Sequence, residues 1–340
     1  MHYHVIIIGG GPAGLSCAQR LAEHNIEVLL IEQQSTIGPK VCAGGITWNG
    51  LLTQLPEHLI ERSFPEQYVK TSWQRCTIKE KTPIIATVNR TVLGTYMAEK
   101  AREAGATLIT GCRVVSIEKN TIEVIDRKTG EQLVFSYNTL VGGDGACSVV
   151  RRFLKLPVKQ RGLGINCHIP ANRNIMEWHL NWPLFKNGYA WIFPHKDTLS
   201  LGAYAARDML SGPELMQGLR QWASQQGLAL QKTQAALVCY DYRGWNFGNI
   251  FLIGEAAGLA SGLTGEGIYP AIVSGEEVAH HILNPSYQPK RLQRLIKMQR
   301  LHSKMVSLTR SRRAARCISE SMVFLLRTRM LSFRNAEMAK

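Results

Sequence analysis

The opening stretch of the chain constrains the fold more than any other. Residues 5–14 read VIIIGGGPAG, an apolar run that ends in closely spaced glycines. The run Tyr3–Ile8 predicts a strand buried on both faces, and the spacing of apolar residues in Ala13–His24 predicts a helix directly after it. A second apolar run, Glu27–Glu32, ends in an acid. This β-turn-α-β unit is typical of the first half of a Rossmann fold.

Each glycine of the G-x-G-x-x-G pattern has a physical role. Gly9 allows the tight turn, Gly11 allows a pyrophosphate to approach the backbone, and Gly14 allows close contact between helix and strand. The pyrophosphate is expected at the N-terminus of the helix, where free N–H groups and the helix dipole favour anions. A carboxylate at the end of the second strand accepts hydrogen bonds from ribose hydroxyls. The sequence therefore predicts dinucleotide contacts from Gly9, Gly11, Pro12, Ala13, Gly14 and Glu32.

Two later glycine-rich segments fit the same ligand and favour FAD. Residues 142–152 read GGDGACSVVRR and residues 248–268 read GNIFLIGEAAGLASGLTGEGI, each after a predicted strand. We expect Asp144 to brace the chain near the cofactor, Arg151 to face the pyrophosphate and Glu255 to bind ribityl hydroxyls. N–H groups of the 265–267 turn and the following helix would face the O2/N1 edge of the flavin. The predicted contacts here are Asp144, Gly145, Ser148, Arg151, Gly254, Glu255, Gly265, Glu266, Gly267 and Ile268.

The remaining pattern predicts an α/β fold with an inserted sheet. Residues 161–242 carry alternating, aromatic-rich strands interrupted by one helix, which predicts a mostly antiparallel substrate domain. We expect a discontinuous FAD-binding domain with a parallel sheet at 1–60, 86–160 and 244–285. The substrate domain is expected at 61–85 and 161–243, and a basic helical tail at 286–340. Three histidines of the inserted sheet have no partner visible in sequence and are expected to be structural: His168, His179 and His195.

Charge is concentrated at the C-terminal end. Residues 286–340 hold 14 Lys or Arg against two acids, a net +12 of the chain's +15. Eight single cysteines show no metal-like spacing, so we expect no metal site and reduced thiols. No apolar run approaches the roughly 20 residues that cross a bilayer, and the first strand leaves no room for a signal peptide. We therefore expect a cytoplasmic protein, with membrane association as an open alternative.

Beyond these patterns, the chain resembles the geranylgeranyl reductase family within the superfamily of para-hydroxybenzoate hydroxylase, from about residue 3 to residue 285. Residues 40–46, KVCAGGI, are similar to the family's K-x-C-x-G-G segment beside the isoalloxazine. Residues 189–194, YAWIFP, are similar to its Y-x-W-x-F-P motif in the substrate cavity. The resemblance implies catalytic roles for Cys42, Tyr189, Trp191 and Phe193. It also implies cofactor contacts from Cys42, Ala43, Gly44, Arg90 and Val114.

The chain departs from the family pattern in three places. Glu255 stands where Asp is usual, which lengthens the arm to the ribityl chain. Gly262 replaces a proline before the T-G-E-G turn. In the helix that normally begins R-x-x-F-D, Arg90 is kept while Leu93 and Gly94 replace the aromatic and the acid.

Three functions stay open at this point. The first is reduction of C=C bonds in a prenyl-type apolar substrate, with hydride from flavin N5 and a proton from Cys42 or Tyr189. The second is a flavin monooxygenase, using a C4a-hydroperoxide, that hydroxylates an aromatic substrate or a partner-protein side chain. The third is a flavin-binding electron-transfer or scaffold protein. FAD is expected to be non-covalent; with no second G-x-G-x-x-G, NAD(P)H is a transient reductant or a partner protein supplies electrons.

Several residues keep a structural alternative. Cys42 either acts in proton delivery or electron transfer, or is a small residue that fits near the flavin face. The aromatic residues at 189–193 either line the substrate cavity or are plain core. In the tail, an amphipathic stripe either binds an anionic membrane surface or packs on the body, and nucleic acid is not favoured because no recognition motif accompanies the charge. The stripe consists of Leu292, Leu295, Met298, His302 and Met305.

Overall fold

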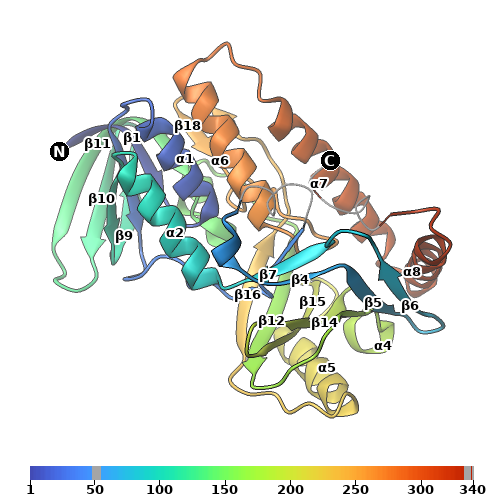
Figure 1. Cartoon of the computed structure of the whole chain (residues 1–340). Coiled ribbons are helices and arrows are strands. Elements are labelled where there is room, and N and C mark those ends of the chain that lie inside the picture. Colours follow the sequence, from blue (N-terminus) through green and yellow to red (C-terminus); the bar gives the residue numbers. More distant parts are fainter. Residues whose placement is uncertain (48–54, 333–337, 339–340) are drawn as a thin grey trace.

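The predicted Rossmann unit forms the centre of the first sheet. The computed structural model describes residues 1–47, 55–332 and 338. Strand β1 (His2–Ile8) runs parallel to β2 (Val28–Glu32) on one side and to β11 (Gln132–Gly142) on the other. β8 (Thr107–Thr110) and β18 (Ile250–Leu252) extend this parallel part, and β17 (Asn246–Phe247) pairs antiparallel at the edge. Helix α1 (Pro12–Ala22) packs against α2 (Arg90–Glu103) and α6 (Ile268–Leu283), as Figure 1 shows.

The long strand β11 takes part in two kinds of pairing. Its first half pairs antiparallel with β10 (Thr121–Asp126), which in turn pairs with β9 (Cys112–Ile117). Its second half runs parallel to β1. No glycine or proline interrupts residues 132–141, so nothing in the local sequence ends the strand between its two pairings.

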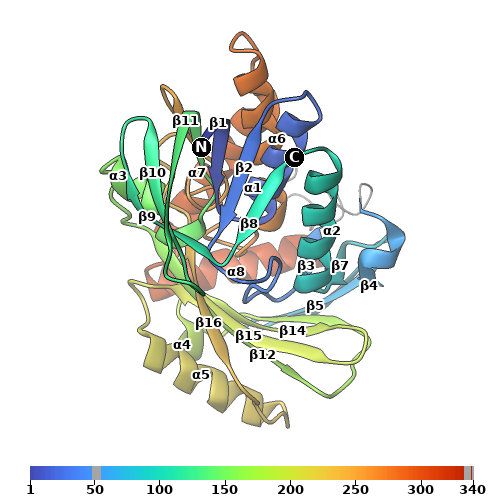
Figure 2. The ribbon, with the colours of Figure 1, turned by 90° about the vertical axis from the view of Figure 1, so that its left-hand side faces the viewer.

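The inserted segment forms a second, mostly antiparallel sheet. Its strand order is β16-β12-β15-β14-β13-β5-β6, with a parallel pairing between β13 and β5. Helix α5 (Gly212–Gln225) covers this sheet with buried Leu215, Leu219 and Trp222, and α4 (Trp182–Phe185) packs beside it (Figure 2). The strands are β5 (Glu66–Lys70), β6 (Arg75–Lys79), β12 (Arg161–Ile169), β13 (Met176–His179), β14 (Tyr189–Pro194), β15 (Leu199–Ala206) and β16 (Gln234–Cys239).

A small third sheet and short helical turns complete the body. β7 (Ile85–Val88) lies between β3 (Gly45–Thr47) and β4 (Ile60–Phe64). The short elements are η2 (Glu57–Leu59), η3 (Gly145–Cys147) and α3 (Val149–Phe153). The chain is thus a mixed α/β protein, with the predicted parallel and antiparallel sheets. The predicted domain boundaries remain a prediction, and within them residues 48–54, 333–337 and 339–340 lie outside the described residues.

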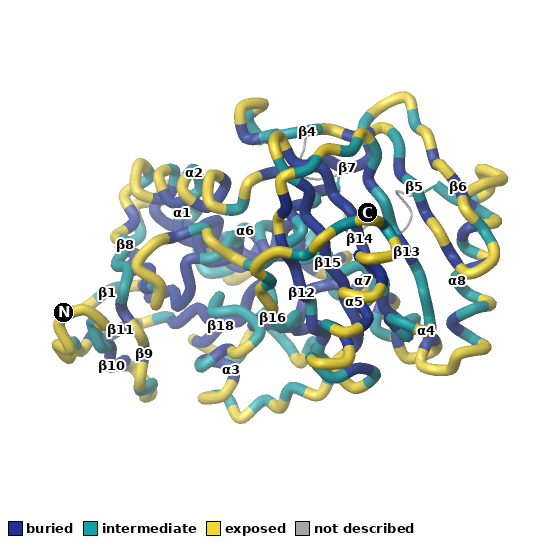
Figure 3. The backbone as a smooth tube through the Cα atoms, turned by 90° about the horizontal axis from the view of Figure 1, so that it is seen from below, coloured by how far each residue is buried: buried dark blue, intermediate teal, exposed yellow. Residues whose placement is uncertain are grey.

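Two helices account for the described part of the basic tail. In α7 (Lys290–Leu308), Leu292 and Leu295 are buried, which shows that the apolar stripe packs on the body of the protein. α8 (Arg312–Arg327) runs beside β6 and packs Val323 and Leu326 into the core of the second sheet. Figure 3 shows the inner strands as buried and much of α8 as exposed or half-buried.

A buried carboxylate fixes α8 to the turn between β5 and β6. Glu320 accepts hydrogen bonds from the Thr71 hydroxyl at 2.7 Å, the Trp73 backbone N–H at 3.1 Å and the Gln74 side-chain amide at 3.0 Å. Three donors satisfy most of the lone pairs of a carboxylate that is only 7% exposed. The helix and the turn therefore form one rigid edge of the second sheet.

Candidate active site

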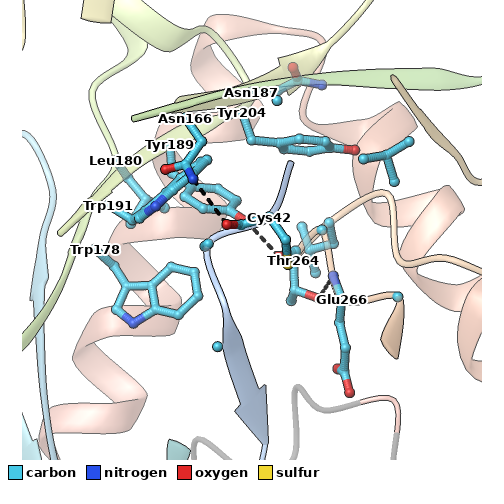
Figure 4. A pocket seen from close by; sticks show the side chains of 18 of the residues that line it. Cys42, Asn166, Trp178, Leu180, Asn187, Tyr189, Trp191, Tyr204, Thr264 and Glu266 are labelled. Atoms are coloured by element: carbon cyan, nitrogen blue, oxygen red, sulfur yellow. Dashed lines mark hydrogen bonds between the residues drawn. The ribbon is translucent and has the colours of Figure 1, made fainter. Parts of the chain in front are cut away.

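One cavity connects the glycine-rich loops with the second sheet and α8. Its volume is about 450 Å³, and predominantly apolar side chains line it. Gly11, Ala13, Gly145 and Gly267 line one part, and Trp178, Trp191 and Phe193 line another. Figure 4 shows Cys42 between the aromatic wall and the Thr264–Glu266 turn. The lining from α8 and its flanks is Thr309, Arg312, Ala315, Arg316, Ile318, Ser319, Met322, Leu326 and Leu331.

The phosphate loop has the geometry that its sequence predicts. Gly9 has φ 107°, and a side chain on Gly14 would place its Cβ 2.0 Å from the Gly9 carbonyl oxygen. A Cβ on Gly11 would meet no protein atom within 4 Å. Gly11 is the N-cap of α1 and no side chain caps that helix, so its first N–H groups face the cavity. Packing therefore explains Gly9 and Gly14, whereas the glycine at position 11 leaves room for a ligand.

Glu32 is held by two backbone donors at the end of β2. Its Oε2 accepts the Gly10 N–H at 2.7 Å, and its Oε1 accepts the Gln34 N–H at 2.8 Å. Each carboxylate oxygen keeps a further lone pair. The side chain is thus oriented and can still accept hydroxyl hydrogen bonds, as a ribose requires.

Unpartnered buried polar atoms mark the middle of the cofactor region. Lys40 forms a 2.8 Å ion pair with Glu255 Oε1, while Glu255 Oε2 is buried and has no hydrogen-bond partner among the described residues. Arg90 Nε is likewise buried and has no hydrogen-bond partner among the described residues. The side chains of Glu255 and Arg90 both line the cavity. A buried polar atom without a partner is costly, so these atoms fit a ligand that carries hydroxyls and phosphates. The residues present therefore fit FAD.

The polar side chains of the segment after β11 mainly form hydrogen bonds with other groups of the protein. Asp144 Oδ2 accepts the Val149 N–H at 2.6 Å while Oδ1 has no described partner, and burial raises the pKa of this carboxyl. Ser148 caps α3 through the Arg151 N–H. The guanidinium of Arg151 is only 2% exposed and donates to the carbonyls of Ala256 and Asp241.

Several predicted cofactor contacts do not line the cavity: Gly9, Gly14, Glu32, Gly44, Val114, Asp144, Ser148, Arg151 and Gly254. Arg151 is absent from the lining and braces the 241 and 256 loops, in contrast to the expectation that it would face the pyrophosphate. Val114 is buried in β9 within the first sheet's core. Gly145 lines the cavity, while Gly254 lies behind it against Ala13 and Ala271.

The T-G-E-G turn places the N-terminus of α6 at the cavity wall. Gly265 has φ 69°, and Gly267 is an N-cap without a side-chain cap. Glu266 accepts the Thr47 hydroxyl and the Met338 N–H, both at 3.1 Å, and burial raises its pKa. The N–H groups of Gly267 and Ile268 are placed to favour negative charge. Contact of these N–H groups with the O2/N1 edge of the flavin stays a prediction.

Side chains of the second sheet hold the loop that carries Cys42. Asn166 donates to the Cys42 carbonyl at 3.0 Å, and His195 Nε2 lies 3.0 Å from the Ala43 carbonyl. His195 Nδ1 pairs with Glu61, and a Cβ on Gly44 would lie 2.5 Å from the imidazole. Gly44 has φ 79° and donates its N–H to the Cys42 thiol at 3.4 Å. The backbone of the loop that carries the thiol is thus held at the cavity wall by contacts with residues more than 120 positions away.

Asn166 and His195 were not identified as site residues from the sequence. His195 was expected to be structural without a visible partner, because its partner Glu61 lies 134 residues away. The alternation of β12 and β14 places one face of the second sheet on the cavity, and that periodicity is the available signal. Trp178, Tyr204 and α8 were not identified either, because the residues that they meet at the cavity lie far away in the chain.

The aromatic residues of β14 form the wall opposite the glycine loops. Tyr189 donates its hydroxyl to the Thr264 carbonyl at 2.5 Å, and burial raises its pKa, with the neighbouring Cys42 adding to the shift. Trp191 donates its indole N–H to Ser200 at 3.2 Å. Phe193 contacts Trp178 edge-to-face at 4.8 Å between ring centroids. All three predicted aromatic residues therefore line the cavity while packing against one another.

The described residues contain neither a cluster of potential metal ligands nor a helix long and apolar enough to cross a bilayer. Residues 2–168 match the FAD binding domain family. The chain is 26% identical to a geranylgeranyl diphosphate reductase of Rhodobacter capsulatus, covering 82% of this chain and 74% of that protein. It is 25% identical to a digeranylgeranylglycerophospholipid reductase of Methanocaldococcus jannaschii, covering 80% and 75%.

Solved structures share this fold at low sequence identity. A geranylgeranyl bacteriochlorophyll reductase-like protein of Thermoplasma acidophilum has a TM-score of 0.75 at 18% identity, covering 92% of this chain and 94% of that one. A probable FAD-dependent monooxygenase of Pseudomonas aeruginosa has a TM-score of 0.71 at 17% identity, covering 94% and 100%. At such identities the likeness shows the fold alone.

Proposed function

Because this chain belongs to the geranylgeranyl reductase-like family of FAD-dependent oxidoreductases, we propose that it reduces C=C bonds of a prenyl-type apolar substrate. The observation that carries the proposal is the hydrogen bonding of the polar groups on the aromatic wall. Every polar tip on that wall is already engaged by a protein acceptor. A substrate beside it would therefore meet ring faces and edges and no free donor.

Four aromatic residues establish this point. The indole N–H of Trp178 donates to Gln67 at 2.9 Å, and that of Trp191 donates to Ser200. The hydroxyls of Tyr189 and Tyr204 donate to the carbonyls of Thr264 and Gly262. A substrate that needs hydrogen bonds would leave its own polar groups unpaired here, whereas an isoprenoid chain has none to satisfy.

The residues around Cys42 would deliver a proton while bound FAD, once reduced, supplies a hydride. Cys42 lies on the cavity wall, fixed by Asn166 and the 43–44 backbone. Tyr189 is the second candidate, although its hydrogen now points to the Thr264 carbonyl. The raised pKa keeps Tyr189 protonated at neutral pH, as a proton donor must be. NAD(P)H or a partner protein would reduce the flavin.

A flavin-dependent monooxygenase is the second candidate, since the P. aeruginosa monooxygenase shares the fold over nearly the whole chain. That activity would act on an aromatic substrate or a partner-protein side chain. It would consume oxygen in proportion to substrate, whereas a reductase would not.

The partner that we propose for α8 is an anionic membrane surface. Phe324 is 47% exposed and Met330 is 75% exposed, next to the exposed cations Arg327 and Arg329. Apolar side chains among cations favour the interface of anionic lipid, where each cation adds roughly 1 kcal/mol. The apolar stripe of α7 does not take part, because it packs on the body. A lipid substrate would then reach the cavity beside α8 without crossing water.

Point variants test this surface, since removing the tail would open the cavity that α8 lines. Co-sedimentation with anionic vesicles should fall for the double variant Phe324→Ser/Met330→Ser. The matched control is Leu301→Ser, which changes an exposed leucine of α7 (49% exposed). Equal vesicle binding by both variants, or no binding by the unaltered protein at low salt, would refute the proposed membrane binding.

Anaerobic mixing tests the proposed reaction. The reduced holoenzyme is mixed with geranylgeranyl diphosphate or geranylgeraniol, and flavin absorbance is followed. We expect reoxidation that depends on the prenyl compound. A flavin that stays reduced with every prenyl compound, but reoxidises with oxygen in a way stimulated by an aromatic compound, would support the monooxygenase instead.

A further inference from the structure

Two buried histidines of the second sheet differ in the number of acceptors that they face. His195 directly follows β14 and is 5% exposed. Its Nδ1 pairs with the Glu61 carboxylate of β4, and its Nε2 lies 3.0 Å from the carbonyl oxygen of Ala43. Among the described residues, His179 of β13, which is equally buried, pairs with one acceptor, Glu177 Oε2 at 2.9 Å. His195 thus faces an acceptor at each ring nitrogen, whereas His179 faces one acceptor.

Two acceptors require two protons in the pair of His195 and Glu61. A carbonyl oxygen only accepts, so the contact with Ala43 needs a hydrogen on Nε2. Without a second proton, the lone pair of Nδ1 would face the negative carboxylate of Glu61. The Glu61 side chain is 22% exposed, so water still stabilises its negative charge and the second proton belongs on Nδ1. Donation to both partners is then possible only for the imidazolium form of His195.

A second titratable side chain, His168 of β12, lies against this imidazole and is neutral. Its ring is edge-on to that of His195, with 5.0 Å between the ring centroids. The side-chain amide of Asn166 donates to the Cys42 carbonyl and lies 3.4 Å from His168 Nε2, which makes that nitrogen an acceptor. Partial burial, followed by the charge of His195, lowers the pKa of His168, while Glu61 opposes the shift. His195 therefore faces an anion from β4 and a neutral imidazole from β12.

The imidazole of His195 lies beside the turn that places Cys42. Gly44 has φ 79°, and a Cβ on it would lie 2.5 Å from the ring. The carbonyls of residues 42, 43 and 44 accept hydrogen bonds at 3.0 Å from Asn166, His195 and the backbone N–H of Val88, respectively; Figure 4 shows the first of these. A hydrogen bond from a charged donor is about twice as strong as a neutral one. The bond from His195 is therefore the strongest of the three that fix this turn.

We propose that His195, kept protonated by Glu61, is the positioning residue that holds the Cys42 thiol in place for proton transfer. This inference rests on the proposed function, and it selects Cys42 over Tyr189 as the proton donor. His195 is not among the residues that line the cavity, so it acts through the Ala43 carbonyl and not on the substrate. Without the charge, the thiol is in place for a smaller fraction of the time. The chemical step then slows, while binding along the aromatic wall is unchanged.

Nitrogen NMR of the FAD-loaded protein with labelled histidine measures the charge directly. The chemical shifts of the two ring nitrogens distinguish an imidazolium from either neutral tautomer, and the His195 signals are assigned through their proximity to the Gly44 backbone. We expect two protonated nitrogens on His195 at neutral pH. A neutral His195 ring in the unaltered protein would overturn the proposal, and this measurement needs no variant to fold.

A matched pair of variants tests the positioning role. Glu61→Gln keeps the size of the side chain and removes the charge that holds the proton on His195. Glu177→Gln makes the same change beside His179, in the same sheet but away from the cavity lining. In Glu61→Gln, the backbone amides of residues 42–46 should exchange hydrogen faster. The kcat with geranylgeranyl diphosphate should fall about fivefold at unchanged KM, because a charged hydrogen bond becomes a neutral one. Glu177→Gln should behave like the unaltered protein in both measurements.

The NMR and exchange measurements use no substrate, so they separate failure of this inference from failure of the proposed reaction. A protonated His195 and faster exchange in Glu61→Gln, without turnover by the unaltered protein, would keep the role of His195 in fixing the loop and refute the reaction. Turnover that Glu61→Gln leaves unchanged would refute the positioning role and keep the reaction. Equal changes in Glu61→Gln and Glu177→Gln would also overturn the positioning role, because a general loss of stability would then explain both.

Discussion

His302 should make the stability of this protein fall at acidic pH. It lies in α7, is 2% exposed, and its Nδ1 is 2.8 Å from the Ser261 hydroxyl oxygen. That oxygen accepts the N–H groups of Leu263 and Thr264, so its own hydrogen points to the imidazole. Nδ1 is therefore an acceptor and the ring is neutral. Burial lowers the pKa of His302 from 6.5 to about 4.

The magnitude follows from the difference between the two pKa values. The unfolded chain takes up the proton near its ordinary pKa, whereas the folded protein resists until about pH 4. Stability from this residue is therefore fully present above the unfolded pKa, and it is lost as the pH falls from there through the folded value. The complete loss is about 3 kcal/mol, of which about 2 kcal/mol falls between pH 7 and pH 5.

Urea unfolding at these two pH values measures the effect. The control variant is His302→Asn, which keeps an acceptor near Ser261 but does not titrate. The unaltered protein should lose about 2 kcal/mol more than the variant between pH 7 and pH 5. Equal losses would refute the reasoning. Because Ser261 also holds the T-G-E-G turn, retention of FAD should decline over the same range in the unaltered protein.

Three further predictions concern the cofactor and the Cys42 loop. Gly11→Val should fold but lose FAD, because the new side chain clashes with no protein atom and occupies the space of the ligand. Gly14→Ala should unfold, because its Cβ would clash with the Gly9 carbonyl oxygen. A Gly11→Val protein with its full content of FAD would refute the assignment of the phosphate loop. FAD should be released by heat or acid, because no attachment motif is present, and flavin that stays with the precipitate would contradict this. Cys42→Ser should keep FAD and lower turnover; an unchanged rate and product would leave the thiol a packing role.

The local parts of the site could be predicted from the sequence. The glycine spacing, the flanking strands and the acid at Glu32 lie within about thirty residues of one another, and each pattern has a direct backbone cause. The helices and strands that were predicted begin and end within a few residues of the observed ones. For the aromatic residues at 189–193 the sequence left cavity wall and plain core both open, and Tyr189, Trp191 and Phe193 line the cavity.

The contacts between distant segments could not be predicted. The pairing of Glu61 with His195, and the hydrogen bond from Asn166 to the Cys42 loop, depend on how the second sheet packs against β4 and the loop before β3. Arg151 illustrates the same limit, because its position in the chain suggests the cofactor while its guanidinium turns to buried carbonyls. Periodicity tells which face of an element is buried but not what covers it. The place of α8 at the cavity likewise follows from tertiary packing.

Product analysis tests the central claim most directly. The FAD-loaded protein is reduced anaerobically, incubated with geranylgeranyl diphosphate, and the prenyl product is analysed by mass spectrometry. We expect a product that has gained two hydrogens for each bond reduced, in amounts that match the flavin oxidised. A prenyl chain recovered unchanged, or a product formed only when oxygen is admitted and carrying an added oxygen atom, would contradict it.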